Sequence, residues 1–210
     1  VHFGTRLLAA GHNLFVHDKS TEARDRLATK GAVPCVSAKE LASKVEIVLL
    51  CLPMPHIVLE VAEEVAKGEK VRIVLDLSTT GPSITQEVSS FLQLQDIKLV
   101  SSPVSGGTVA AEKGTLAVMP AGPTNAYREI EPILQVIGKN IFYMGTDPTL
   151  GQTMKIINNT LYATSMVASS EALIYGVKAG LDSKMMLDVI NVSSGRSFAT
   201  MERIPQCVLD

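Results

Sequence analysis

The sequence predicts an α/β protein in which a doubly wound, mostly parallel sheet is followed by an all-helical segment. Short apolar runs alternate with helical stretches from the N-terminus to about residue 145. Strict alternation of strands and helices along the chain is typical of a parallel sheet. Past Asp147 no strand-like run returns, and residues 155–180 and 183–192 both have helical patterns. We therefore place a domain boundary between residues 146 and 147.

The elements of the first segment follow from their apolar pattern and from the residues at their ends. Residues 1–12 predict a short helix, and residues 13–17 predict a strand that ends at Asp18. Ser20 suits the N-cap of a helix over residues 20–30, because its hydroxyl can accept a backbone hydrogen bond of the first turn. Further strands are expected over 32–35, 45–52, 71–75, 97–100 and 140–144, and further helices over 37–43, 57–67, 82–94 and 124–137. Residues 45–52 are apolar on both faces, which is typical of a central parallel strand.

The first helix and strand carry half of a dinucleotide-binding pattern. In that pattern a glycine turn opens the first helix, and an acidic residue at the end of the second strand binds the ribose hydroxyls. Gly4 fits the last glycine and Asp18 fits the acidic residue, while the first glycine position falls before Val1. We therefore expect a Rossmann-type domain over residues 1–146 that lacks its first strand, with Gly4 and Asp18 binding the cofactor. Asp18 favours NAD because a carboxylate repels a 2′-phosphate, and the neighbouring Lys19 leaves NADP open.

Ligands of such sheets bind outside the carboxyl ends of the strands. This rule selects the segments that follow four expected strand ends, namely Asp18, 52–54, 76–80 and 102–107. Within the last of these, the backbone N–H groups of Ser105, Gly106 and Gly107 could form an anion-binding nest for a small carboxylate. The alternative is a plain turn rich in serine and glycine.

The segment 151–159 opens a long apolar helix with unexpected polar residues. Lys155 and Asn159 are four residues apart, so both side chains leave the helix on one face. The helix carries few charges, which predicts that protein covers most of it and that Lys155 is partly desolvated. Desolvation lowers the pKa of a lysine and makes it a usable proton acceptor. The alternative is a lysine that reaches out to water from a helix end.

Composition narrows the function classes. The 210 residues are 46% hydrophobic, with a net charge of −2 and no basic run, which argues against nucleic acid as the main ligand. No window approaches the roughly 18 uninterrupted apolar residues of a membrane span. Three scattered cysteines predict reduced thiols in the cytoplasm, or in the mitochondrial matrix if the source is eukaryotic. No metal site is predicted.

Taken together, five ordered motifs resemble those of the 3-hydroxyacid dehydrogenase family, which includes 3-hydroxyisobutyrate dehydrogenase and tartronate semialdehyde reductase. They are 76–79, 102–107 followed by 114–116, 151–159, 180–182 and 191–196. The resemblance covers essentially the whole chain. It implies hydride transfer between NAD(P) and a short 3-hydroxy acid, of the 3-hydroxyisobutyrate or glycerate and tartronate semialdehyde type.

The resemblance also implies roles for individual residues. Lys155 would be the catalytic general acid and base, and Asn159 would orient the substrate. The carboxylate would be held by Ser105, Gly106 and Gly107, and the nicotinamide cofactor site would be lined by Leu52, Pro53 and Thr79. A homo-oligomer through the helical domain is expected, because the long helix has so few charges.

The chain departs from the family pattern in places. The Gly-x-Gly strand before Gly4 is missing, Thr149 stands where a glycine usually lies, and family members continue past Asp210, so a chain shortened at both ends is expected. Two rivals remain. A 6-phosphogluconate dehydrogenase-like enzyme would have a glutamate where Tyr162 stands, and a nonenzymatic oligomerising scaffold of this fold would have lost Lys155.

Overall fold

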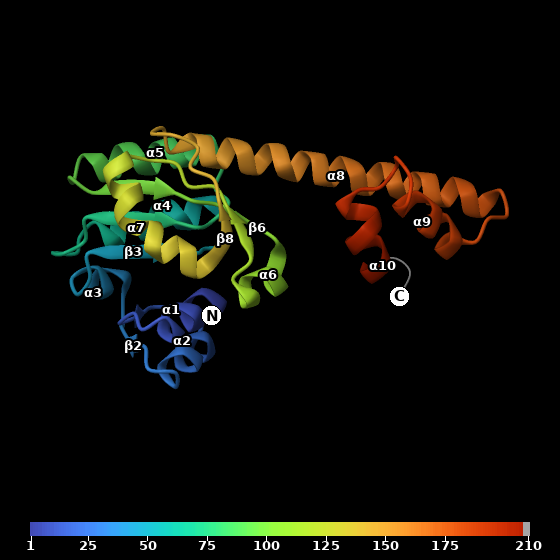
Figure 1. Ribbon diagram of the computed structural model, residues 1–210. Helices are drawn as coiled ribbons and strands as arrows, with labels where there is room; N and C mark the ends of the chain where they lie inside the picture. The colour runs from blue at the N-terminus through green and yellow to red at the C-terminus, as the bar shows by residue number, and fades with distance from the viewer. Residues whose placement is uncertain (208–210) are drawn as a thin grey trace. The chain divides into compact units, whose positions relative to one another are not determined.

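The computed structural model describes residues 1–207, which form two compact units (Figure 1). The first unit is Val1–Lys155 and the second begins at Ile156. The division falls inside one helix, α8 (Thr149–Lys178), because the first turn of that helix packs against the first unit. The boundary predicted at 146–147 lies just ahead of this helix.

The first unit alternates strands and helices as predicted. Its strands are β1 (Phe15–Val16), β2 (Val33–Pro34), β3 (Ile47–Leu50), β4 (Ile73–Asp76), β5 (Lys98–Ser101), β6 (Val104–Ser105), β7 (Leu116–Val118) and β8 (Gly138–Ile141). Its helices are α1 (His2–Ala9), α2 (Thr21–Ala28), α3 (Ala38–Ala42), α4 (Pro55–Val65), α5 (Pro82–Gln93), α6 (Gly107–Lys113) and α7 (Thr124–Ile137). Ser20 caps α2 as predicted, since its hydroxyl accepts a hydrogen bond from the Ala23 N–H at 3.2 Å.

The strands form three sheets rather than the single continuous sheet that the alternation predicts. β1 pairs with β2, and β3, β4 and β5 form a second parallel sheet. β6, β7 and β8 form a third, in which β6 runs antiparallel to β7. An isolated bridge between Ser101 and Ala121 connects the second and third sheets. The interruption between β1 and β3 falls where strand 1 lies in the doubly wound order.

The central strand is β4 rather than the predicted segment 45–52. All four residues of β4 are buried, whereas Ile47 and Leu49 of β3 are only half-buried. Neighbouring residues of β4 point to opposite faces and enter two different cores. Val74 packs with α3, α4 and α5, and Ile73 and Leu75 pack with α7. Helices therefore cover both faces of the sheet, which confirms the doubly wound class.

The second unit is all-helical, as predicted. It contains the rest of α8, then α9 (Ser183–Asn191), a π-helical turn η1 (Ala199–Arg203) and α10 (Ile204–Cys207). Its core is small and is built around Leu173, Leu187 and Ile204. η1 and α10 were not predicted, and residues 208–210 of the predicted segment 147–210 lie outside the described residues. Among residues 1–207, no helix is long and apolar enough to cross a membrane.

Candidate functional site

The carboxyl ends of β3, β4 and β5 lie side by side and form the rim of the site. Leu50 is in register with Asp76, and Asp76 is in register with Ser101. The predicted rim segments 52–54, 76–80 and 102–107 begin at these three residues or within two residues after them. Strand register therefore brings together the segments that the carboxyl-end rule selected.

A buried carboxylate and a serine hydroxyl hold two of these segments together. The side chain of Asp76, which is only 3% exposed, accepts a hydrogen bond from the Ser78 N–H at 2.9 Å. Burial raises the pKa of Asp76, and hydrogen bonds from Ser78 and Thr80 partly offset this rise. The Ser78 hydroxyl accepts a hydrogen bond from the Leu52 N–H at 2.9 Å. Thr79 is exposed between two buried residues, so its side chain is available to a ligand.

Lys155 lies at the end of the first unit, two turns into α8. It is half-buried, and burial lowers the pKa of its amine. No ion pair of Lys155 with a carboxylate occurs within residues 1–207. These findings confirm the predicted desolvation of this lysine, whereas most of the rest of α8 is exposed, contrary to the prediction that protein covers it. Asn159 follows one turn later along α8, in the second unit, and its substrate-orienting role stays a prediction.

The first turn of α8 is held tightly against the rim. A Cβ on Gly151 would lie 2.4 Å from the Met119 carbonyl oxygen and 3.3 Å from Pro103, so only glycine fits this approach. The next residue, Gln152, is fully buried and hydrogen-bonds to the loop after β4 and to Ser101 at the end of β5. Gln152 was not among the residues predicted from the sequence. The available signal was an amide three residues before Lys155, at the spacing that places both on one helix face.

The segment 105–107 forms the N-terminal end of α6. Gly106 has φ = +135° and Gly107 has φ = +73°, so both glycines adopt backbone conformations that other residues rarely enter. Gly106 also packs closely, because a Cβ there would lie 2.7 Å from Cβ of Ala110. Successive N–H groups in such a turn at a helix start suit an anion. The carboxylate-binding role of Ser105, Gly106 and Gly107 stays a prediction.

The two residues predicted to bind the cofactor's adenosine part lie on α1 and after β1. A Cβ on Gly4 would lie 2.9 Å from the Leu27 side chain, so Gly4 lets α1 approach α2 closely. Asp18 is exposed, and its carboxylate accepts a hydrogen bond from the Ser20 N–H at 2.8 Å. Cys51 is an exposed residue, yet desolvation raises the pKa of its thiol, and Asp76 and Asp18 raise it further.

Two family descriptions match this chain, one for each part. The family described as the NAD binding domain of 6-phosphogluconate dehydrogenase matches residues 2–145. The family described as the NAD-binding of NADP-dependent 3-hydroxyisobutyrate dehydrogenase matches residues 149–210. The gap between the two matches coincides with the start of α8.

Individual proteins are similar over nearly all of the chain. The probable mitochondrial 3-hydroxyisobutyrate dehydrogenase of Dictyostelium discoideum is 36% identical over 95% of this chain, which spans 63% of that protein. The 2-(hydroxymethyl)glutarate dehydrogenase of Eubacterium barkeri is 32% identical over 97% of this chain and 68% of that protein. Among solved structures, a Mycobacterium tuberculosis 3-hydroxyisobutyrate dehydrogenase with L-serine has a TM-score of 0.88 and 27% identity, over 97% of this chain and 70% of that one.

Proposed function

Because this chain belongs to the 3-hydroxyacid dehydrogenase family, we propose that it transfers a hydride between NAD or NADP and a short 3-hydroxy acid. The observation that carries the proposal is Lys155, a half-buried amine of lowered pKa whose helix is anchored to the rim of a parallel sheet. A general base works best when its pKa lies near the working pH. Lys155 meets that requirement better than an exposed lysine.

The residues at the rim fit a dinucleotide cofactor. Gly4 lets α1 pack closely on α2, and Asp18 has a second carboxylate oxygen for the ribose hydroxyls. Leu52, Pro53 and Thr79 would contact the nicotinamide end, since Leu52 and Thr79 belong to segments tied together by Ser78. When bound, the cofactor supplies the hydride acceptor or donor.

The protein's own residues would handle the proton and the substrate's charge. In the oxidation, neutral Lys155 takes the proton of the substrate hydroxyl, and in the reduction the ammonium returns it. Ser105, Gly106 and Gly107 would hold the carboxylate through backbone N–H groups, and Asn159 would orient the hydroxyl-bearing carbon. Orientation of this kind supplies much of an enzyme's rate enhancement.

A substrate screen tests the proposal. Purified full-length protein is incubated with NAD or NADP and a panel of acids that contains 3-hydroxyisobutyrate, glycerate, L-serine and 2-(hydroxymethyl)glutarate, and nicotinamide reduction is followed by absorbance. We expect turnover of at least one acid, and reduction of a semialdehyde such as tartronate semialdehyde in the reverse assay. Turnover of 6-phosphogluconate alone would favour that rival enzyme, and no saturable cofactor binding would favour the scaffold.

Asp18 is expected to make NAD the preferred cofactor. Asp18→Ala should weaken NAD binding roughly tenfold or more, since a hydrogen bond to a charged group contributes about 1.5–3 kcal/mol. NADP binding should change less or improve, because the variant removes a repulsive charge. Lys19→Ala is the neighbouring control and should sharpen the preference for NAD. Fluorescence titration gives the dissociation constants of NAD and NADP for the wild type and both variants. A wild-type preference for NADP would contradict this role of Asp18.

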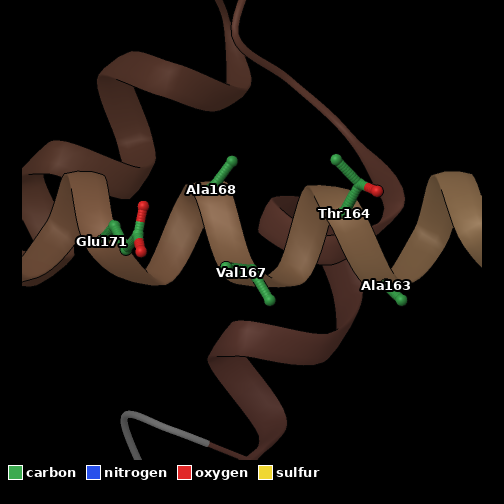
Figure 2. A pocket seen from close by; sticks show the side chains of 5 residues that line it. All are labelled: Ala163, Thr164, Val167, Ala168 and Glu171. Atoms are coloured by element: carbon green, nitrogen blue, oxygen red, sulfur yellow. The ribbon is translucent and has the colours of Figure 1, made fainter.

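We also propose that the helical unit forms a homo-oligomer with a second copy of the chain. α8 and its surroundings expose large apolar side chains, including Leu161, Val167, Ile174 and Tyr175. A hollow of about 390 Å³ lies along the same helix (Figure 2), lined by Ala163, Thr164, Val167, Ala168 and Glu171. Soluble monomers rarely expose large apolar patches.

Solution measurements test this association. Sedimentation velocity at micromolar concentration should show a dimer or larger species for the wild type, and Val167→Glu should shift it toward the monomer. Val36→Glu places the same charge on an exposed valine of the first unit and should leave the distribution unchanged. A monomeric wild type would contradict the proposal.

The free cysteines of residues 1–207 support a reducing compartment, either the cytoplasm or the mitochondrial matrix.

A further inference from the structure

We propose that Gln152 is a positioning residue for Lys155, because its buried amide fixes the first turn of α8 to the loop after β4 and to the end of β5, at the rim of the proposed reaction centre. The inference rests on the proposed function of Lys155 as general acid and base. It assigns a role to a residue that touches neither cofactor nor substrate. Gln152 would act through the lysine one turn further along the helix.

The amide of Gln152 makes every hydrogen bond that it can make. Its Oε1 accepts from the N–H groups of Thr80, at 3.1 Å, and Gly81, at 3.3 Å. Its Nε2 donates to the Ser78 carbonyl oxygen, at 3.0 Å, and to the Ser101 hydroxyl, at 3.0 Å. A primary amide has two acceptor positions and two N–H donors, so its capacity is filled. The partners also fix which end is oxygen, because backbone N–H groups only donate and a carbonyl oxygen only accepts.

No other residue type satisfies this site. The side chain is 0% exposed, so water cannot replace a missing partner. An apolar side chain of the same length would leave the buried Thr80 N–H, the part-buried Gly81 N–H and the Ser78 carbonyl oxygen without this partner, and the loop would have to move to pair them again. A carboxylate could accept from Thr80 and Gly81 but could not donate to Ser78. An amide side chain is therefore the one that satisfies all of these hydrogen-bonding partners.

The bonds connect segments that are far apart in the sequence. The Thr80 and Ser101 partners are 72 and 51 residues away from Gln152. Ser78 also ties its loop to Leu52, and Thr80 shares a hydrogen bond of 2.8 Å between hydroxyls with Thr85 of α5. Thr79, which is predicted to line the cofactor, thus sits between two residues whose backbones Gln152 holds.

Lys155 depends on this anchoring. It follows Gln152 by three residues on the same helix, so the fixed turn sets where the lysine side chain begins. Gly151 clamps the other side of the turn against Met119 and Pro103. A lysine side chain has four rotatable bonds, and misplacement of a reacting group by about 1 Å can cost roughly 10²-fold in rate. Burial is the only cause that lowers the pKa of Lys155, and no charged side chain in the described part of the chain contributes to it.

The test combines kinetics with a readout that needs no turnover. Gln152→Met keeps the size of the side chain and removes its hydrogen bonds. We expect kcat to fall roughly 10²-fold, with a small change in KM for the hydroxy acid. In parallel, lysines of the full-length protein are methylated with ¹³C-formaldehyde, and the Lys155 signal, assigned with Lys155→Arg, is titrated by NMR. Its midpoint should move to higher pH in Gln152→Met, because a loosened turn lets the amine reach water.

Two controls separate positioning from general loss of stability. Gln86→Met changes an exposed glutamine of α5 whose amide donates only to Ser90 on the same helix. Ile130→Val trims a fully buried side chain of α7 and should lower the melting temperature while leaving the four hydrogen bonds of Gln152 in place. Both controls should keep the wild-type kcat and the wild-type Lys155 titration.

The outcomes are distinct. A folded Gln152→Met protein with wild-type kcat and an unmoved Lys155 titration would overturn the role of Gln152. If the wild type turns over no hydroxy acid, the proposed function fails, and the titration alone then supports or overturns the positioning role. If Gln152→Met does not fold, Ser101→Ala removes one of the four hydrogen bonds and should shift kcat and the titration in the same direction by smaller amounts. No shift in Ser101→Ala would overturn the inference.

Discussion

Replacing Lys155 with alanine is expected to lower kcat for a short 3-hydroxy acid by roughly 10²–10⁴-fold, the range that general acid–base catalysis contributes. The cofactor's dissociation constant should stay nearly unchanged, since Lys155 acts on the proton of the substrate hydroxyl. Stopped-flow or steady-state nicotinamide absorbance gives kcat, and fluorescence titration gives the cofactor affinity. A variant that keeps wild-type turnover would remove Lys155 from the mechanism.

The pH dependence follows from the direction of the Lys155 pKa shift. Oxidation needs the neutral amine, so its rate should rise with pH until the pKa of Lys155 is passed. Burial lowers that pKa from the ordinary lysine value of 10.5, so the rate should level off at a lower pH than an exposed lysine would allow. In Lys155→Ala this rise of the oxidation rate with pH should disappear.

Two further variants define what kind of lysine function is lost. Lys155→Arg keeps the positive charge but cannot give up a proton at accessible pH, so it should be as inactive as Lys155→Ala if proton transfer matters. Activity in the arginine variant would instead indicate that charge alone suffices. Lys178→Ala removes an exposed lysine from the last turn of the same helix and should leave kcat unchanged.

Replacing Gly106 with alanine is expected to lower kcat/KM for the hydroxy acid by roughly 10²-fold, comparable to the loss of one donor from a preorganised anion site. The backbone there has φ = +135°, which strains any residue with a Cβ, and the added Cβ would lie 2.7 Å from Cβ of Ala110 and 3.1 Å from the Leu116 side chain. The turn must open, and its N–H groups then leave the substrate carboxylate. Cofactor affinity should change little.

Neighbouring glycines provide matched controls for this variant. Gly107→Ala introduces backbone strain at φ = +73° but meets no atom within 4 Å, so its effect should be smaller. Gly31→Ala introduces similar strain after α2, at φ = +104°, again with nothing within 4 Å, and should lower stability without raising KM. An unchanged KM in a folded Gly106→Ala protein would contradict the carboxylate nest. That result would instead favour the alternative that residues 105–107 are a turn rich in serine and glycine with no role in carboxylate binding.

Much of the fold could be predicted because its signals are local. The hydroxyl of Ser20 and the apolar periods of α5 and α7 act within a few residues, and the structure confirms them. Strand pairing is different. The antiparallel placement of β6 depends on backbone hydrogen bonds between distant segments, which no short pattern encodes.

By itself, the sequence determined the class of fold, the segments that form the rim, and Lys155 as the candidate base. Each of these follows from an apolar periodicity or from a short ordered motif. Only the tertiary structure decided that Asp76 is buried, that Ser78 ties its loop to Leu52, and that Gln152 holds α8 against the rim. A polar residue looks the same in a sequence whether water or protein surrounds it. Its burial and partners are set by segments many residues away, which meet only when the chain has folded.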